Sequence, residues 1–311
     1  MENWLAVLFF FLSAYAVIAN DSIQTLDTWM VSNKSIKWYW LATFASLGLI
    51  LTLIGGWYTY HGDFAFGRLE KIPFQPITWI FGLAPIALII LTRLSVPVST
   101  SFLILSTFAN QDVFQEMVIK SVVGYGLSAF LAYLTWIGLS RLINEQQNVQ
   151  PEHESKWRIA QWCSTGFLWW SWLSHDLANI AVFFPRSISF ELLLFTCRFF
   201  SAVIFFIFSE NGGSIQKVVI NKTGTQYVRS ATLIDFFFAL ILVVFKEWNS
   251  IPMSTTWVFI GLLSGRELAI ATSSQKRDIK SVFPIVREDF MKLVLGMGVS
   301  VVVAYAVNLL K

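Results

Sequence analysis

The stretch Ser95–Phe102, which reads SVPVSTSF, recurs 155 residues later as Ser250–Trp257, which reads SIPMSTTW. Four of the paired positions are identical and four are conservative. The same offset places Asp21 opposite Asp176, although that pair was not used to define it. Two polar segments in one register indicate that the chain contains an internal duplication, because unrelated patterns would not share an offset.

The composition is that of a membrane protein. Of 311 residues, 56% are hydrophobic and 13% are charged, with 14 Trp and 29 Phe. The polar surface of a soluble monomer could not cover so many apolar side chains, and disordered, collagenous, coiled-coil and disulfide-rich secreted classes are excluded as well. We therefore expect a lipid bilayer as the surroundings and no nucleic-acid partner. Cys163 and Cys197 lie in apolar runs and are interpreted as small buried side chains.

Apolar runs long enough to cross a bilayer, about 20 residues each, predict an all-α polytopic membrane protein. Two further segments, 76–110 and 230–272, are interrupted by polar stretches that contain proline, so each is either a pair of spans or a re-entrant hairpin. The uninterrupted runs lie at roughly 3–20, 38–60, 117–143, 160–184, 187–209, 230–248 and 290–310.

The number of crossings predicts how the two halves are oriented. Each half of the chain, 1–150 and 151–311, crosses the membrane an odd number of times, whether its interrupted segment is a pair of spans or a hairpin. We therefore expect two inverted-topology repeats with broken or re-entrant helices, forming one membrane domain. Thirteen of the 22 Lys and Arg then fall on one side, which the positive-inside rule makes cytoplasmic. The expected protein is a multi-pass plasma (inner) membrane protein with both termini outside.

Two buried-looking carboxylates suggest a cation site. An ionised Asp at the bilayer centre costs about 2.5–3.5 kcal/mol on insertion scales, so a pair of them calls for compensation. Carboxylate and amide oxygens suit a sodium ion, whereas an imidazole beside a carboxylate keeps proton coupling as an alternative. The candidate cation-binding residues are Asn20, Asp21 and Gln24 in the first repeat and His175, Asp176 and Asn179 in the second.

The Pro-x-Ser-Thr clusters suggest an anion site. Proline ends the preceding segment and Ser or Thr commonly caps a helix, so each cluster should present hydroxyls and free backbone N–H groups at the start of a half-helix. Two such clusters facing each other would suit a tetrahedral oxyanion. The candidate substrate-binding residues are Ser99, Thr100, Ser101, Ser254, Thr255 and Thr256, together with Asp21 and Asp176.

These motifs resemble those of the PiT-type inorganic phosphate transporters, whose repeats carry Gly-Ala-Asn-Asp-x-x-Asn and then Pro-Val-Ser-Thr-Thr-His. The first motif reads IANDSIQ at Ile18–Gln24 and LSHDLAN at Leu173–Asn179, and the second reads PVSTSF at Pro97–Phe102 and PMSTTW at Pro252–Trp257. The resemblance implies phosphate import driven by a sodium or proton gradient, with the Asp and Ser-Thr residues at the site. It also implies a homodimer and no cofactor besides the coupling ion.

The chain departs from the family pattern at four positions. Phe102 and Trp257 replace both motif histidines, and Gln24 and His175 each replace an asparagine. Both carboxylates and both Ser-Thr pairs remain. Sulfate or another tetrahedral oxyanion therefore stays as an alternative substrate, and the proton as an alternative coupling ion.

Two other classes of protein need to be weighed. An intramembrane hydrolase could use the two aspartates or the pair Ser174 and His175, but adjacent residues on a helix do not face each other. The three histidines, His61, His153 and His175, are spread along the chain, so no zinc site is indicated. A passive anion channel is the other alternative. The sequence favours a transporter over an enzyme, with alternating access driven by rocking of the repeats.

Charged residues outside the motifs receive simpler interpretations. Arg68 and Lys120 are counted as basic residues of the non-cytoplasmic side, and Asp235 is placed at a membrane interface. Arg93 is expected to contact the anion if the Ser-Thr clusters lie in mid-membrane, and to be only a positive-inside residue if they lie at the surface.

Overall fold

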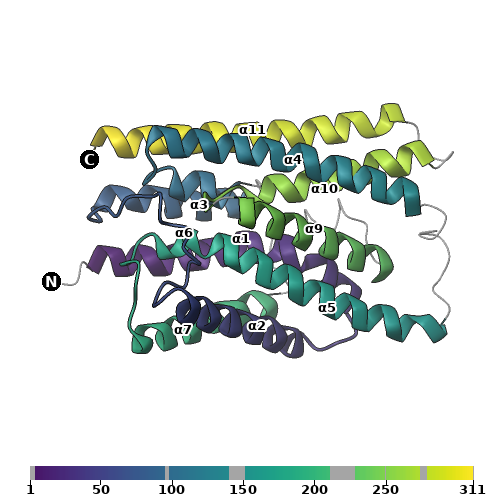
Figure 1. The fold of residues 1–311 in the computed structure, drawn as a ribbon, viewed down its shortest axis with the longest axis horizontal. Coiled ribbons are helices and arrows are strands. Elements are labelled where there is room, and N and C mark those ends of the chain that lie inside the picture. Colours follow the sequence, from purple (N-terminus) through teal and green to yellow (C-terminus); the bar gives the residue numbers. More distant parts are fainter. Residues whose placement is uncertain are drawn as a thin grey trace.

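The chain folds into a bundle of helices (Figure 1), and the computed structural model describes residues 4–94, 98–139, 151–210, 228–248, 250–273 and 279–310. Within these ranges there is no β-strand. The α-helices are α1 (Trp4–Ser32), α2 (Trp38–Thr59), α3 (Leu83–Arg93), α4 (Gln111–Leu139), α5 (Pro151–Asp176), α6 (Ala178–Ala181), α7 (Phe190–Ser209), α9 (Val228–Trp248), α10 (Thr255–Ser273) and α11 (Ile279–Leu310). A 3₁₀ turn, η1 (Trp79–Gly82), precedes α3, and a π-helical segment, η2 (Ser101–Leu105), precedes α4.

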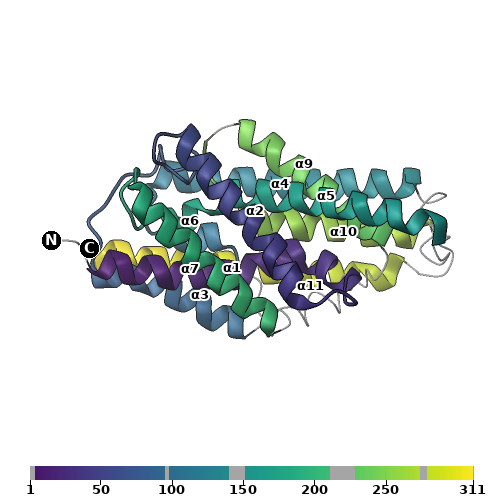
Figure 2. The same cartoon turned by 90° about the horizontal axis from the view of Figure 1, so that it is seen from below.

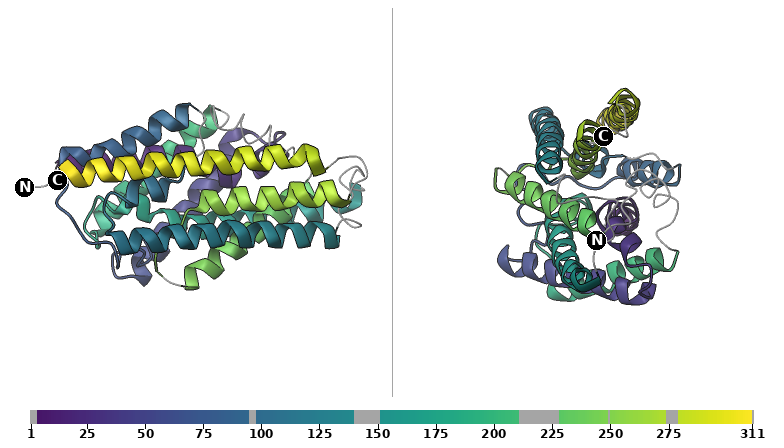
Figure 3. Two further views of the ribbon diagram at one scale, coloured as in Figure 1. Left: turned by 90° about the horizontal axis from the view of Figure 1, so that it is seen from above. Right: turned by 90° about the vertical axis from the view of Figure 1, so that its right-hand side faces the viewer.

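The long helices lie roughly along the long axis of the molecule. Helices α4, α10 and α11 extend together along one face (Figure 3), and α2 lies beside α7 (Figure 2). Helix α5 packs along α9. Six helices of the described chain are long and apolar enough to cross a membrane, namely α1, α2, α4, α7, α9 and α11. The prediction of an all-α polytopic membrane protein is confirmed.

Helices related by the offset of 155 run in opposite directions. In Figure 1, α1 runs from left to right and its counterpart α5 runs from right to left. The same reversal holds for α2 and α7, and for α4 and α11. The start of α1 and the end of α11 both lie at the left-hand end. These directions support an inverted duplication. The repeat boundary near residue 150 falls outside the described residues. That boundary, and the side of the membrane on which the termini lie, stay predictions.

Both interrupted segments fold as hairpins that turn inside the molecule. Gln75 Nε2 donates to the Phe108 carbonyl oxygen at 2.9 Å, so the two ends of the first hairpin lie together. Helices α9 and α10 both extend from the middle of the molecule to its right-hand end (Figure 1). The two tips meet, because Ser101 Oγ donates to the Met253 carbonyl oxygen at 3.1 Å. The structure thus favours hairpins over pairs of spans.

Two predicted spans have different limits in the structure. Helix α1 continues to Ser32 instead of ending at residue 20, because its polar side chains find buried partners; Thr28, for example, donates to Asp235 at 2.7 Å. The predicted span 160–184 is divided into α5 and α6 at Leu177. Hydropathy misplaces both limits because it scores these buried polar residues as if they faced lipid.

Two glycines bring α4 and α10 into close contact. A Cβ atom on Gly265 would collide with the Ala129 carbonyl oxygen, and one on Gly261 with that of Tyr125. This Gly-x-x-x-Gly spacing is typical of helix pairs in membranes, where small residues let two backbones approach. The packing holds the middle of α10 against α4.

Candidate functional site

Two carboxylates from equivalent positions of the chain meet at one hydroxyl. Thr100 Oγ1 donates to Asp21 Oδ2 at 2.7 Å and lies 3.5 Å from Asp176 Oδ1. Asn179 Nδ2 donates to Thr100 Oγ1 at 3.0 Å and to Asp176 Oδ1 at 2.8 Å. The Asp21 and Asp176 side chains are each 1% exposed. The structure therefore brings together, in the interior, residues that the sequence places in three separate motifs.

The first serine of each Ser-Thr cluster caps its half-helix. Ser99 Oγ accepts a hydrogen bond from the Phe102 backbone N–H at 3.1 Å, and Ser254 Oγ accepts one from the Trp257 N–H at 3.3 Å. These pairs are equivalent at the offset of 155. Such bonds satisfy donors that a helix start leaves free. In this structure Ser99 and Ser254 shape the tips.

The remaining hydroxyls of the clusters lie around the carboxylates. Ser101 Oγ is 3.4 Å from Asp176 Oδ1, besides its bond to Met253. Thr255 lies beside the Asp176 carboxyl group, as Thr100 does beside Asp21. Thr256 is buried on the same turn as Thr255. Each carboxylate is thus approached by the threonine of its own repeat.

Asn20 ties the Asp21 carboxylate to the first hairpin. Its Nδ2 atom donates to Asp21 Oδ1 at 2.6 Å and to the Val98 carbonyl oxygen at 3.1 Å. Thr92 donates to Asn20 Oδ1 at 3.3 Å. A movement of this hairpin would therefore disturb the surroundings of Asp21.

Two buried oxygen atoms at the site accept no hydrogen bond in the structure. They are Asp176 Oδ2 and Asn179 Oδ1. Unsatisfied buried acceptors are unfavourable, and carboxylate and amide oxygens are the ligands that hard cations prefer. These oxygen atoms are therefore suitable ligands for a monovalent cation such as sodium. Across the described ranges no group of three or more His, Cys, Asp or Glu side chains could hold a metal ion.

One predicted cation ligand is not part of this set, and another falls outside the described residues. The His175 ring turns to Leu242, with Nε2 2.7 Å from its carbonyl oxygen, and to Arg68, whose Nη2 lies 2.5 Å from Nδ1. His175 therefore does not complete the cation site as the sequence led us to expect, because its ring nitrogens face these two residues. The Gln24 side chain lies outside the described part of the chain.

Sequence reasoning assigned the wrong surroundings to three charged residues and left a fourth, Arg93, open. Arg68 and Lys120 are 2% and 4% exposed, so they belong to the interior and not to the surface loops. Asp235, expected at an interface, is buried and accepts hydrogen bonds from Thr28 and Thr165 at 2.7 and 2.5 Å. Arg93 is exposed at the end of α3, away from the buried carboxylates.

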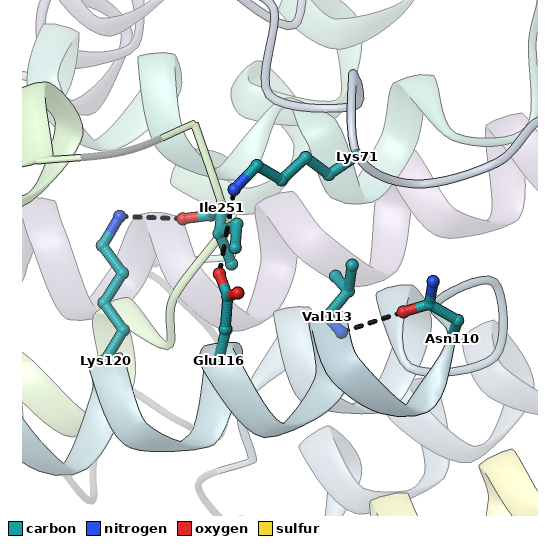
Figure 4. Close-up of polar contacts among 6 residues, drawn as sticks. All are labelled: Lys71, Asn110, Val113, Glu116, Lys120 and Ile251. Carbon is teal, nitrogen blue, oxygen red and sulfur yellow. Dashed lines mark hydrogen bonds and ion pairs between the residues drawn. The ribbon is translucent and has the colours of Figure 1, made fainter.

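Lys120 holds the tip of the second hairpin. Its Nζ atom donates to the Ile251 carbonyl oxygen at 2.8 Å (Figure 4). One turn earlier on α4, Glu116 pairs with the exposed Lys71 at 3.8 Å, and Asn110 Oδ1 caps the helix by accepting from the Val113 N–H at 2.9 Å (Figure 4). A basic residue in the first half of an apolar run was the signal that could have singled out Lys120.

Comparisons with known proteins place this arrangement in a class. The hairpins that meet at buried carboxylates and the membrane-spanning helices define a polytopic membrane transporter fold. The chain is similar to a solved structure described as "The sodium-dependent phosphate transporter", with a TM-score of 0.69, 17% identity and 99% of each chain covered. No protein-family model matches, and neither does a curated protein. The shared fold agrees with the resemblance to the PiT-type family.

Proposed function

We propose that the protein is a secondary active transporter that imports a tetrahedral oxyanion, with inorganic phosphate as the first candidate, coupled to a sodium gradient. The observation that carries this proposal is the convergence of Asp21 and Asp176 on the Thr100 hydroxyl where the two hairpin tips meet. A fold shared over its full length with a sodium-dependent phosphate transporter supports it.

The cation is held by the acidic side of the site. Asp21 and Asp176 supply carboxylate oxygens, and Asn179 supplies the free amide oxygen next to them. A bound cation offsets charges that would otherwise be buried without compensation. Asn20 acts indirectly, by orienting Asp21.

The oxyanion is held by hydroxyls and backbone N–H groups at the two half-helix starts. Thr100, Ser101, Thr255 and Thr256 supply the hydroxyls, while Ser99 and Ser254 shape the turns. Helix N-termini attract anions because their N–H groups and dipole are positive. An anion beside a bound cation is more stable than either ion alone, and this mutual dependence is the physical basis of coupling.

The burial of the site is compatible with alternating access. Thr100 and Ser101 are each 1% exposed, so both side chains are shielded from solvent in this conformation. We propose that rocking of one half against the other opens the site to each side in turn. A passive channel would need a continuous path instead. The homodimer that the resemblance implies stays a prediction.

The geometry of His175 favours sodium over the proton as coupling ion. Arg68 Nη2 lies 2.5 Å from Nδ1 and 2.8 Å from Nε2 of the His175 ring. A protonated ring would face the guanidinium as a second positive charge. Ser174 donates to the Ser171 carbonyl oxygen at 2.8 Å and not to His175, which counts against a hydrolase.

The proposal is tested by uptake of labelled phosphate into proteoliposomes under an imposed sodium gradient. A matched potassium gradient, a proton gradient and an excess of unlabelled sulfate are the controls. We expect accumulation with sodium alone that sulfate does not suppress. Competition by sulfate would mean that the substrate is not phosphate alone. Accumulation driven only by a proton gradient would mean that the coupling ion is the proton and not sodium. No accumulation under any gradient, from folded protein, would reject phosphate transport.

A further inference from the structure

A buried polar cluster lies between the candidate site and the end of the molecule at which α1 ends. Asp235 of α9 accepts hydrogen bonds from Thr28 of α1 at 2.7 Å and from Thr165 of α5 at 2.5 Å. None of the three side chains is more than 2% exposed. We call this cluster the polar gate. Thr28 belongs to the first half of the chain and the other two residues to the second, so the gate joins the two halves.

The polar gate is aligned with the site carboxylates. Thr28 follows Asp21 by seven residues on α1, and Thr165 precedes Asp176 by eleven residues on α5. Both spacings are close to whole numbers of helical turns, so each threonine lies on the same face as its carboxylate, about 10 and 16 Å further along the axis. Because α1 and α5 run in opposite directions, both displacements lead toward the right-hand end of Figure 1. An ion that leaves the site along these faces meets Asp235.

A second polar layer continues this path beyond the gate. Asn33 Nδ2 donates to Gln161 Oε1 at 3.2 Å, and Arg158 Nη1 donates to Asn33 Oδ1 at 3.1 Å. Gln161 lies one turn before Thr165 on α5, and the Asn33 and Gln161 side chains are fully buried. Polar groups in the interior of a membrane protein are unfavourable unless they are paired, and they commonly mark the pathway of an ion or substrate.

The opposite end of the site is closed by aromatic rings. Phe10 of α1 stacks on Phe184 with ring centroids 4.0 Å apart, and Phe108 meets Phe183 edge to face at 5.4 Å. We call these four residues the aromatic plug. Ser13, on the same side of the site, uses its hydroxyl to donate to a backbone carbonyl oxygen at 3.0 Å. The plug also joins the two halves of the chain, but through apolar contacts.

The two closures occupy equivalent positions of the repeats. The offset of 155 places Thr28 opposite Phe183 and Thr165 opposite Phe10, so a hydroxyl in one closure corresponds to a ring in the other. The position equivalent to the gate carboxylate is held by Ile80, which is apolar and 2% exposed. The inverted repeats therefore close the site with opposite chemistry at its two ends.

We infer that the polar gate, with Asp235 at its centre, is the closure that opens when the site holds no ions, while the aromatic plug stays shut. This inference rests on the proposed function. Opening the gate exchanges hydrogen bonds within the protein for hydrogen bonds to water, which nearly balance. Separating the plug exposes apolar rings to water, at a cost that grows with their area. The uncompensated carboxylates of an empty site also favour hydration from the polar side.

The inference is tested by the rate at which a membrane-impermeant thiol reagent labels two matched single-cysteine variants, T25C and V17C. Thr25 and Val17 lie four residues after and four residues before Asp21, on the gate side and the plug side, and neither is more than 1% exposed. The full-length protein is held in lipid nanodiscs, where the reagent reaches both ends, and the native cysteines are replaced by serine. In sodium-free solution we expect T25C to react faster than V17C. Sodium with phosphate should slow the labelling of T25C.

Substitutions in each closure give the matched comparison. D235A removes the acceptor that both gate threonines share. In the presence of sodium and phosphate it should raise the T25C labelling rate by roughly 10- to 100-fold, the effect expected for a lost hydrogen bond to a charged group. The V17C rate should not change. F10A opens a gap in the plug and should raise the V17C rate while leaving the T25C rate as it was.

Several results would overturn the inference. Faster labelling of V17C than of T25C in sodium-free solution would do so with the gate intact, and so would equal rates, so the inference can fail even if D235A does not fold. An unchanged T25C rate in a monodisperse D235A protein would remove Asp235 from the gate. Labelling that ignores sodium, together with no sodium-driven phosphate uptake, would reject the proposed function itself. Normal uptake with V17C as the faster position would reject only the inference.

Discussion

Phe102 and Trp257, the two aromatic residues at the motif-histidine positions, meet edge to face, with ring centroids 5.9 Å apart and planes at 86°. Both side chains are buried, and they occupy equivalent positions of the two repeats. A pair of rings in this orientation is favourable by about 0.5–1.5 kcal/mol beyond the area buried. Where the PiT-type motif has a histidine in each repeat, this chain has an apolar contact between its two hairpins.

This contact predicts a loss of stability when one ring is removed. F102A should lower the free energy of unfolding by about 3–5 kcal/mol, as for other large-to-small changes in a core. F102L retains most of the volume and should cost less. Thermal unfolding in one detergent compares the variants. Equal melting temperatures for F102A and the wild type would show that the two rings do not hold the hairpins together.

The Thr100 hydroxyl is predicted to determine the sodium dependence of uptake. T100V keeps the shape but leaves the Asp21 carboxylate without its 2.7 Å donor. The loss of a hydrogen bond to a charged group is worth about 1.5–3 kcal/mol, so the sodium concentration for half-maximal uptake should change by roughly 10- to 100-fold. T100S retains the hydroxyl and should remain near wild type. A T100V protein with unchanged sodium dependence would remove Thr100 from the site.

The close approach of α4 and α10 predicts that Gly265 tolerates no side chain. G265A places a methyl group against the Ala129 backbone, which cannot move aside without displacing α4. We expect little folded protein in membranes. G298A on α11 is the matched control, since a Cβ there meets nothing within 4 Å. Size-exclusion profiles of the two variants make the comparison, and a normal profile for G265A would contradict the packing.

Lys120 is predicted to stabilise the second hairpin tip. K120M removes the donor to the Ile251 oxygen and leaves that carbonyl group without this partner. An unsatisfied buried group costs about 1–3 kcal/mol, so we expect a lower melting temperature and weaker phosphate uptake. K71M, which removes an exposed ion pair, should change stability by less than about 1 kcal/mol. Similar effects of the two substitutions would argue against a special role for Lys120.

The sequence predicts much of the fold because its apolar runs and duplicated motifs depend only on residues that are close together in the sequence. The constant offset identified the residues that meet at Thr100, and the Pro-x-Ser-Thr clusters indicated half-helix starts. The resemblance of these motifs to a known family agreed with the shared fold.

Residues that act across long sequence distances were not predictable in the same way. Arg68 lies in a polar loop, and only tertiary folding brings it to His175, 107 positions away. Asp235 was taken as interfacial because nothing nearby in sequence reveals its partners Thr28 and Thr165. The end of α1 was misplaced for the same reason, since buried polar contacts do not register in hydropathy.

The central claim, that the buried carboxylates couple a cation to oxyanion import, is tested most directly by the variant D21N. Phosphate accumulation is measured in proteoliposomes with and without an inward sodium gradient, for wild type and D21N at equal amounts of folded protein. The account predicts concentrative, sodium-dependent uptake in the wild type and its loss in D21N at an unchanged melting temperature. Sodium-stimulated accumulation retained in D21N would contradict it.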